Sequence, residues 1–299
     1  MIVIVGPTAV GKTSTAIQLA KHFDTEIISA DSRQFFKELT IGTAKPTLAE
    51  QAQAKHHFID NKSITETYNA SDFEQEVIPF LENWFKQQNT IVMCGGSGMY
   101  VNAVLNGFDE NIPSANKELR ILLNNQLKQK GIAYLQEQLR ELDPEFYQVV
   151  DLHNSKRLLR AIEVCLTSGK PYSEMRKGQK KERNFIPIKI GIERERSVLY
   201  HRINQRVDEM IKEGLMEEAK TLIDYKDKNA LKTVGYSEVF QLMEGRYDLP
   251  AAIEKIKTNS RRYAKRQLTW FKRDSEIKWF DADAIPEIIK YIRNRISKG

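Results

Sequence analysis

Glycine, lysine and hydroxyl residues are grouped near the N-terminus at a spacing that suits phosphate binding. The run is Gly6-Pro7-Thr8-Ala9-Val10-Gly11-Lys12-Thr13, which fits the pattern G-x-x-x-x-G-K-[ST]. Glycines allow backbone N–H groups to converge on an anion, and the N-terminus of a following helix adds partial positive charge. Lys12 would neutralise the outer phosphate, and Thr13 would hold Mg²⁺ through its hydroxyl. We therefore expect a bound diphosphate or triphosphate. The motif does not indicate which bond of this ligand is broken.

A second polar group, Asp31-Ser32-Arg33-Gln34, follows the apolar run Glu26–Ala30. If that run is a strand, Asp31 lies at its carboxyl end, where open α/β sheets bind their ligands. An aspartate there could cap a helix, hold a metal ion or act as a general base, and its position alone does not decide. The glycine-containing segments Ile41–Pro46 and Cys94–Tyr100 could be tight turns or walls of the same site.

Two arginines form a further candidate for anion binding. Arg202 and Arg206 lie four residues apart in a predicted helix, beside the apolar positions Leu199, Ile203 and Val207. Like charges at this spacing repel one another unless an anion lies between them. A solvated basic face, paired with nearby acidic residues, is the alternative.

The elements that must position these residues alternate between strand and helix. The runs Ile2–Val5, Glu26–Ala30, Ile91–Cys94 and Ile188–Ile192 are predicted strands, and helical patterns separate them. This order is typical of an α/β fold with a parallel sheet flanked by helices, here of the P-loop NTPase-like kind. The pair His56-His57 is predicted to belong to a strand or its edge.

Residues 114–184 differ from the rest because their pattern is helical throughout. We predict an all-helical insertion there, with 1–113 and 185–299 forming the catalytic core. The insertion holds 14 Lys/Arg against 9 Asp/Glu, so its charge of +5 is most of the +6 of the chain. Its basic positions could bind nucleic acid or form a solubilising surface. Eight of them lie in two groups, Lys156, Arg157 and Arg160 in one helical stretch and Arg176, Lys177, Lys180, Lys181 and Arg183 in a following polar linker.

Composition excludes several classes of protein. The chain has no run of eighteen apolar residues, so we expect no membrane span. Its N-terminus leads straight into the phosphate-binding motif, without the pattern of a signal peptide. Cys94 and Cys165 provide neither a disulfide framework nor a zinc site, which suits a reducing cytoplasm.

Six strings occur in a fixed order along the chain: G-P-T-A-V-G-K-T, D-S-R-Q, I-G-T-A-K-P, G-G-S-G-M-Y, K-R-L-L-R-A-I-E-V and R-R-Y-A-K-R-Q-L-T-W-F. Together they resemble the bacterial tRNA dimethylallyltransferase family, also called IPP transferases. The similarity runs from Val3 to about Phe271. It implies transfer of a dimethylallyl group from dimethylallyl diphosphate to N6 of the adenine immediately 3′ of the anticodon in tRNA.

The resemblance also implies roles for individual residues. Lys12 and Thr13, with Mg²⁺, would stabilise the departing diphosphate, and Arg206 would reach the same group. Asp31 would hydrogen-bond N6 and take its proton. Ser97 stands where the family usually has threonine, so its hydroxyl is retained for a contact with phosphate or base.

The same resemblance implies an RNA surface and a set of partners. The residues expected to contact tRNA are Asp31-Ser32-Arg33-Gln34, Ser97, Arg120, Lys156-Arg157-Leu158-Leu159-Arg160 and Lys232-Thr233-Val234-Gly235-Tyr236-Ser237. Ser237 replaces a residue that is more often basic in relatives. The helical insertion would contact the anticodon stem-loop, and no membrane or obligate protein partner is expected.

Three other functions use the same motifs. A P-loop kinase acting on a small molecule would bind ATP in the loop and transfer its phosphoryl group. An adenylate prenyltransferase would carry out the same alkylation on a free nucleotide, without need of the basic insertion. A non-enzymatic, RNA-binding regulatory NTPase would leave Asp31 without a role.

Overall fold

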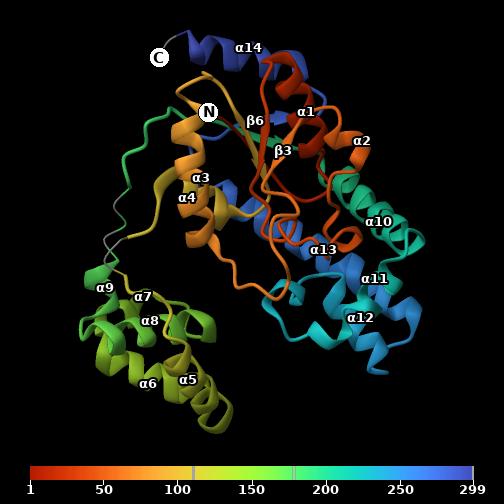
Figure 1. Ribbon diagram of the computed structural model, residues 1–299. Coiled ribbons are helices and arrows are strands. Elements are labelled where there is room, and N and C mark those ends of the chain that lie inside the picture. The colour runs from red at the N-terminus through yellow and green to blue at the C-terminus, as the bar shows by residue number, and fades with distance from the viewer. Residues whose placement is uncertain (110–111, 177, 179, 298–299) are drawn as a thin grey trace. The chain divides into compact units, whose positions relative to one another are not determined.

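The computed structural model describes residues 1–109, 112–176, 178 and 180–297. Its larger unit is built on six parallel strands in the order β3-β2-β4-β1-β5-β6 (Figure 1). The strands are β1 (Ile2–Val5), β2 (Ile27–Ser29), β3 (His56–His57), β4 (Val92–Gly95), β5 (Ile188–Glu193) and β6 (Lys278–Asp281). The predicted α/β fold with a parallel sheet is thereby confirmed.

The predicted strands agree with β1, β2, β4 and β5 to within one or two residues, and β3 holds the histidine pair at the sheet edge. The sequence did not predict β6. Its residues Lys278 and Asp281 are exposed and the two aromatic residues between them are half-buried, as suits an edge strand. Because this segment has no run of apolar residues, its sequence does not indicate a strand.

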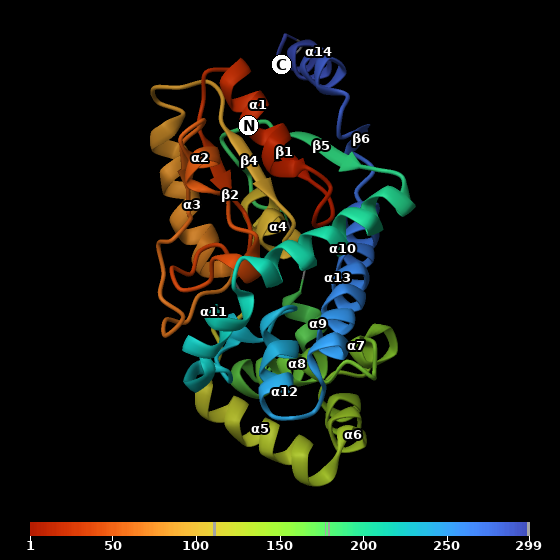
Figure 2. The same cartoon turned by 90° about the vertical axis from the view of Figure 1, so that its right-hand side faces the viewer.

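Helices flank the sheet of this unit. They are α1 (Lys12–His22), α2 (Leu48–Gln51), α3 (Ala70–Trp84), α4 (Gly98–Asn106), α10 (Arg196–Lys212), α11 (Leu215–Thr221), α12 (Tyr236–Met243), α13 (Leu249–Phe271) and α14 (Ile285–Ile296), with the 3₁₀ turns η1 (Ile41–Thr43), η2 (Ile223–Tyr225) and η3 (Asn229–Leu231). Four of these helices, α1, α10, α13 and α14, contribute to one apolar core with β1, β2, β4 and β5. Helices α10 and α13 pack together near the carboxyl ends of the strands, close to the loop after β1 (Figure 2).

The second unit is helical and has a core of its own. It comprises α5 (Lys117–Lys130), α6 (Ile132–Leu142), α7 (Pro144–Val149), α8 (Ser155–Ser168) and α9 (Tyr172–Met175). Leu123, Leu135, Leu139, Phe146 and Leu158 form the centre of its core. The compact unit runs from Asn106 to Glu182, and Met1–Leu105 with Arg183–Gly299 form the other unit.

The helical unit begins earlier than the residue 114 that the sequence predicts, because polar contacts attach the preceding segment to it. The carboxylate of Asp109 accepts the backbone N–H of Gly178 at 3.3 Å, and the carbonyl of Pro113 accepts the Arg160 guanidinium at 2.7 Å. These contacts involve backbone polar groups outside the helices, which a helical pattern does not reveal.

Asp143 is fully buried in the helical unit, where it receives three hydrogen bonds. Its donors are the backbone N–H of Phe146 at 2.9 Å and the N–H and hydroxyl of Ser173 at 2.7 and 2.8 Å. Asp143→Ala removes the acceptor and leaves buried donors without a partner, so we expect a loss of about 3 kcal/mol in the stability of this unit.

Urea denaturation checks this expectation because Trp84, Trp270 and Trp279 all lie in the larger unit. Far-ultraviolet circular dichroism of Asp143→Ala should lose part of its amplitude at lower urea, while the midpoint of tryptophan fluorescence stays in place. Asp151→Ala, at an exposed aspartate of the same unit, is the control. Equal shifts by both probes would show that the two units unfold together.

Candidate active site

The glycine-rich loop joins β1 to α1, so the first turn of α1 faces the bound group. Gly11 caps this helix in the left-handed region, with φ of 116°, and the first turn contains no acidic side chain. Gly6 passes so close to β5 that an added Cβ would lie 2.6 Å from the carbonyl oxygen of Ile192. The two glycines therefore permit a backbone path that a larger residue would block.

Contacts from three other elements hold the back of this loop. The Arg202 Nε donates to the carbonyl of Ala9 at 2.9 Å, and the Arg194 Nε donates to the carbonyl of Val10 at 3.0 Å. Arg194 is itself held by both carboxylate oxygens of Asp283, at 2.8 and 2.7 Å. These contacts hold the loop backbone against α10 and the segment after β5.

A pocket opens beside the loop, within the larger unit. Its lining combines loop residues with the ends of β2 and β4, the segment after β2, and the helices α10 and α13. The lining residues are Thr8, Ala9, Lys12, Thr13, Asp31, Arg33, Gln34, Gly42, Thr43, Ala44, Cys94, Gly95, Gly96, Ile203, Arg206, Val207, Met210, Thr233, Val234, Gly235, Ile256, Ser260, Tyr263 and Gln267. Of the residues expected to form the site, Lys12, Thr13, Asp31 and Arg206 lie around this one cavity, whereas Ser97 is buried and is not part of the lining.

Lys12, Arg33 and Arg206 are the cationic residues of this lining, and the environment of Lys12 and Arg206 perturbs the pKa of both. Desolvation by the pocket walls lowers the pKa of Lys12 to about 8, with Arg206 adding to the effect while Cys94 and Asp31 oppose it. Desolvation and the neighbouring Arg202 also lower the pKa of Arg206. Within the described residues neither makes an ion pair with a carboxylate, although the Lys12 ammonium donates to the carbonyl of Pro7 at 2.7 Å. Two enclosed cations of this kind favour an anionic ligand.

The two arginines of α10 have different contacts. Arg202 binds the outer side of the loop through the Ala9 carbonyl, whereas Arg206 lines the pocket. The spacing of four residues suggested that an anion lies between the two arginines. In the structure, Arg202 instead donates to the protein backbone.

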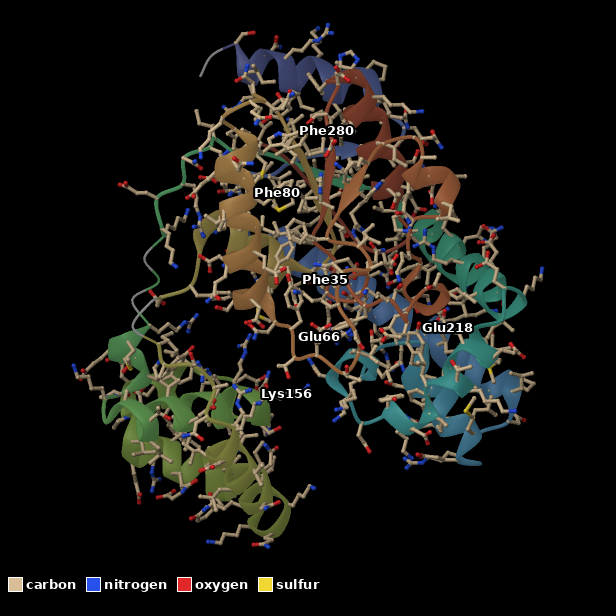
Figure 3. The ribbon with its side chains drawn as sticks, viewed as in Figure 1. Phe35, Glu66, Phe80, Lys156, Glu218 and Phe280 are labelled. Atoms are coloured by element: carbon tan, nitrogen blue, oxygen red, sulfur yellow. The ribbon has the colours of Figure 1, made fainter. Side chains whose placement is uncertain are left out.

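Asp31 follows β2 in a turn and does not cap a helix. One of its carboxylate oxygens accepts the backbone N–H of Arg33 at 2.9 Å, which closes an Asx-turn. The Ser97 hydroxyl accepts the N–H of Ser32 at 2.9 Å and holds the same turn to the loop after β4. Phe35 (Figure 3) anchors the end of the turn in a cluster with Phe73, whose ring centroid lies 5.2 Å away.

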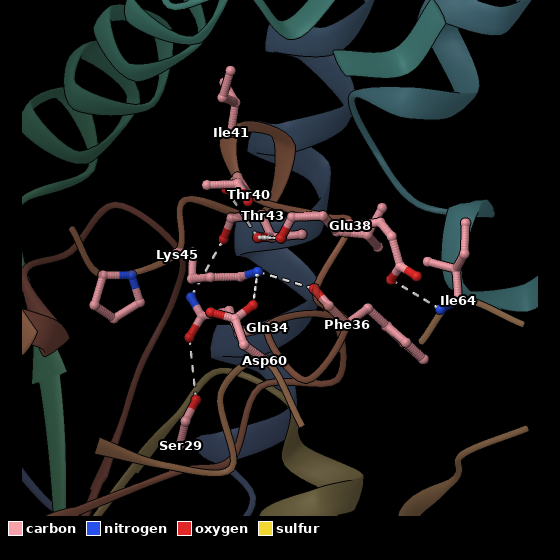
Figure 4. Close-up of polar contacts among 12 residues, drawn as sticks. Ser29, Gln34, Phe36, Glu38, Thr40, Ile41, Thr43, Lys45, Asp60 and Ile64 are labelled. Carbon is pink, nitrogen blue, oxygen red and sulfur yellow. Dashed lines mark hydrogen bonds and ion pairs between the residues drawn. The ribbon is translucent and has the colours of Figure 1, made fainter. Parts of the chain in front are cut away.

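Gln34 lines the pocket, but its amide is occupied within the protein (Figure 4). Its carbonyl accepts the Ser29 hydroxyl at 3.1 Å, and its amide nitrogen donates to the carbonyls of Thr43 and Ala44 at 3.3 and 3.2 Å. In this structure Gln34 shapes the wall formed by the segment after β2.

Two residues of α13 in the pocket were not identified from sequence. Burial, with Asp31 close by, raises the pKa of Tyr263 to about 12, and a hydrogen bond with Ser97 opposes the rise. Gln267 accepts the N–H of Thr8 at 2.8 Å and donates to the carbonyl of Gly96 at 2.8 Å. Tyr263 and Gln267 lie four residues apart, which indicates that they share one face of the helix. This spacing does not indicate which loops they contact.

The helical unit presents some of the expected RNA residues and conceals others. Lys156 and Arg157 are exposed, whereas Leu158 is fully buried in the core of the unit. Helix periodicity turns the Leu158 side chain inward, so the surface of this segment is formed by its neighbours. Leu159 is half-buried against the same core. Arg120 and Arg160 are joined through the buried carboxylate of Glu163, at 3.0 and 2.9 Å.

The segment 232–237 divides in the same way. Thr233, Val234 and Gly235 line the pocket, Lys232 is exposed, and Ser237 is half-buried. Tyr236 is fully buried, so a side-chain contact with RNA is not available to it.

Metal ligands are few near this pocket. Within the described residues, no group of three or more His, Cys, Asp or Glu side chains could hold a metal ion. Thr13 lies in the lining with no hydrogen bond from its hydroxyl to other described residues.

No helix in the described part of the chain is both long and apolar enough to cross a membrane. Lys177, one of the predicted basic residues, lies outside the described residues.

Known proteins resemble this chain along almost its full length. A relative named tRNA dimethylallyltransferase, from Flavobacterium johnsoniae, is 52% identical over 299 residues, covering 98% of this chain and 96% of the relative. Another of that name, from Christiangramia forsetii, is 50% identical over 298 residues, covering 99% and 98%.

Solved structures agree. The tRNA isopentenylpyrophosphate transferase from Bacillus halodurans matches with a TM-score of 0.73 and 37% identity, over 99% of this chain and 96% of that one. A eukaryotic dimethylallyltransferase, solved acting on tRNA, matches with a TM-score of 0.83 and 26% identity, over 100% and 79%. The IPP transferase family model matches residues 34–274. The resemblance seen in the sequence motifs is confirmed: this chain belongs to the IPP transferase family, to which tRNA dimethylallyltransferases belong.

Proposed function

We propose that this pocket transfers the dimethylallyl group of dimethylallyl diphosphate to N6 of the adenine immediately 3′ of the anticodon in tRNA. The observation that carries the proposal is the pairing of two enclosed cations, Lys12 and Arg206, with Asp31 across one cavity. The cations suit a leaving diphosphate, and the carboxylate suits an amino group that must lose a proton.

The leaving group would occupy the loop end of the pocket. As the C1–O bond breaks, its electron pair passes to the diphosphate, and negative charge grows on the oxygens there. Lys12, Arg206 and the amides at the start of α1 are already oriented toward this charge, so stabilisation requires little rearrangement.

The dimethylallyl group requires an apolar wall beside the phosphate site. Ile203, Val207 and Met210 of α10 and Ile256 of α13 supply such side chains to the lining. The first two and Ile256 are buried behind the pocket surface, so the wall excludes water from the reacting carbon.

N6 of adenine is a weak nucleophile because its lone pair is delocalised into the ring. Its attack on C1 forms the N–C bond, and Asp31 would take the proton that N6 gives up. One Asp31 oxygen is held by the N–H of Arg33, which orients the carboxylate. Ser97 fixes the same turn through Ser32 and would contact the base or phosphate from there.

Mg²⁺ fits this donor set. Magnesium commonly binds one or two protein oxygens together with substrate phosphates and water. The hydroxyl of Thr13 lies in the lining beside Lys12, so we propose that Thr13 holds the ion. When bound, the ion would supply further charge neutralisation for the diphosphate.

The RNA must present an unstacked base, since N6 cannot be alkylated within a base stack. Exposed basic residues suit the phosphates of the anticodon stem-loop. Lys156 and Arg157 of the helical unit, Lys232 before α12, and Arg262 and Lys265 of α13 have this character. We propose that Asp31, Ser32, Arg33, Gln34, Ser97 and the pocket-lining part of the segment 232–237 surround the base.

Incubation with labelled dimethylallyl diphosphate, Mg²⁺ and either unmodified tRNA or AMP tests the proposal. We expect label in tRNA at the adenine 3′ of the anticodon and none in AMP. Label in AMP alone would indicate an adenylate prenyltransferase, and ATP turnover without transfer of label would indicate a kinase or NTPase. Either result contradicts the proposal.

Asp31→Asn tests the general base while preserving the turn, because the asparagine carbonyl can still accept the N–H of Arg33. We expect the rate of single-turnover transfer to fall by about a hundredfold or more, with the Kd for dimethylallyl diphosphate nearly unchanged. Asp31→Ala should have at least as large an effect on the rate. Weaker diphosphate binding with an unchanged rate would identify Asp31 as a ligand contact.

The pKa of Lys12 predicts a pH dependence. A bound diphosphate raises this pKa above the value of about 8 in the free protein. Above pH 8 binding must therefore take up a proton, and affinity should fall by up to about tenfold for each pH unit. Calorimetric titration with dimethylallyl diphosphate measures this fall. Lys12→Arg, which keeps its charge, should lose the dependence, and a parallel decline in that variant would assign it to another group.

A further inference from the structure

Glu218 of α11 binds a segment of the pocket wall from outside the pocket. Its carboxylate accepts the backbone N–H groups of Thr40, Ile41 and Gly42 at 3.1, 2.9 and 3.1 Å. Three consecutive N–H groups at the start of η1 thus converge on one carboxylate, that of Glu218, which is labelled in Figure 3. Such a cluster of amides is a binding site for negative charge, here filled by the protein itself.

The same carboxylate also accepts the hydroxyl of Tyr236, at the start of α12. The Tyr236 ring is fully buried and packs on Gly42, where an added Cβ would lie 2.5 Å from a ring carbon. Burial and Glu218 raise the pKa of Tyr236, so its hydroxyl remains a donor. Glu218 therefore joins two segments that are far apart in the sequence.

Both joined segments line the pocket, although Glu218 does not. The first contributes Gly42, Thr43 and Ala44, and the second contributes Thr233, Val234 and Gly235. Neither includes a residue of the phosphate-binding loop.

Several other polar contacts hold the first segment to nearby parts of the chain. Gln34 binds the carbonyls of Thr43 and Ala44, and the Lys45 ammonium binds the Phe36 carbonyl at 2.9 Å and pairs with Asp60 (Figure 4). The contacts of Glu218 instead reach the segment from the C-terminal part of the chain.

We infer that Glu218 is a positioning residue for the target base: through these two segments it fixes the walls that receive the adenine, without a part in holding the diphosphate. The inference rests on the proposed function. A neutral glutamine at this position would bring its own N–H groups toward donors, so the amides of residues 40–42 and the Tyr236 hydroxyl could not all be satisfied.

Electrostatics alone predicts the opposite effect of a substitution. Loss of a negative charge near an RNA site should strengthen RNA binding in general. Glu217 provides a matched control, because it is the adjacent carboxylate on the same helix and is exposed. Glu217→Gln and Glu218→Gln change the net charge equally.

The experiment measures kcat and KM for tRNA, and the Kd for dimethylallyl diphosphate without tRNA. We expect Glu218→Gln to lower kcat/KM for tRNA by about tenfold or more, with the diphosphate Kd within about twofold of wild type. Glu217→Gln should match or exceed wild type with tRNA. Tyr236→Phe should lower kcat/KM for tRNA in the same direction, and its effect should not add to that of Glu218→Gln.

Tyr236→Phe keeps the test decisive if Glu218→Gln does not fold. If the wild type is active and Glu218→Gln has the same kcat/KM for tRNA as Glu217→Gln, the inference is wrong and the proposed function stands. The same conclusion follows if Glu218→Gln loses diphosphate binding and tRNA turnover equally. Absence of transfer to tRNA by the wild type would instead overturn the proposed function and this inference with it.

Discussion

The enclosure of positive charge beside the N-terminus of α1 is the constraint on which the rest of the site depends. Lys12 and Arg206 face a pocket whose desolvation lowers the pKa of both, and no carboxylate among the described residues pairs with either. This arrangement is unfavourable until an anion enters. The surrounding elements must therefore hold the charges in place, and three of them grip the backbone of the loop at Thr8, Ala9 and Val10.

Local patterns predicted the parts of the site that depend on local backbone chemistry. The loop was recognisable because glycines, a lysine and a threonine must occur at fixed spacing between a strand and a helix. Asp31 was recognisable because it follows an apolar run that forms β2. Helical periodicity also indicated that Leu158 faces inward. Leu158 and Ile162 lie four apart on one face of α8, and both are fully buried. Leu158 was included in the predicted RNA surface because it lies within a segment of basic residues.

The remaining parts depend on partners that no local pattern specifies. The sequence indicated that Arg202 and Arg206 lie about one turn apart on α10. Whether each of them contacts backbone or ligand depends on how that helix crosses the loop. Gln267 and Glu218 lie on helices with ordinary polar neighbours, and their roles become visible only when distant loops are brought to them. The early start of the helical unit likewise involves a contact between residues distant in sequence, in which the carboxylate of Asp109 accepts the N–H of Gly178, 69 residues away.

The bracing by Gln267, Arg194 and Arg202 has a consequence for the end of a catalytic cycle. Because side chains of the protein hold the loop backbone in place, the loop has little flexibility to gain when a product leaves, so opening of the loop would contribute little to emptying the site. Pyrophosphate retains its charge after the allyl group has gone and would still face Lys12 and Arg206. Its escape would then depend on competition from water and solution ions for that charge.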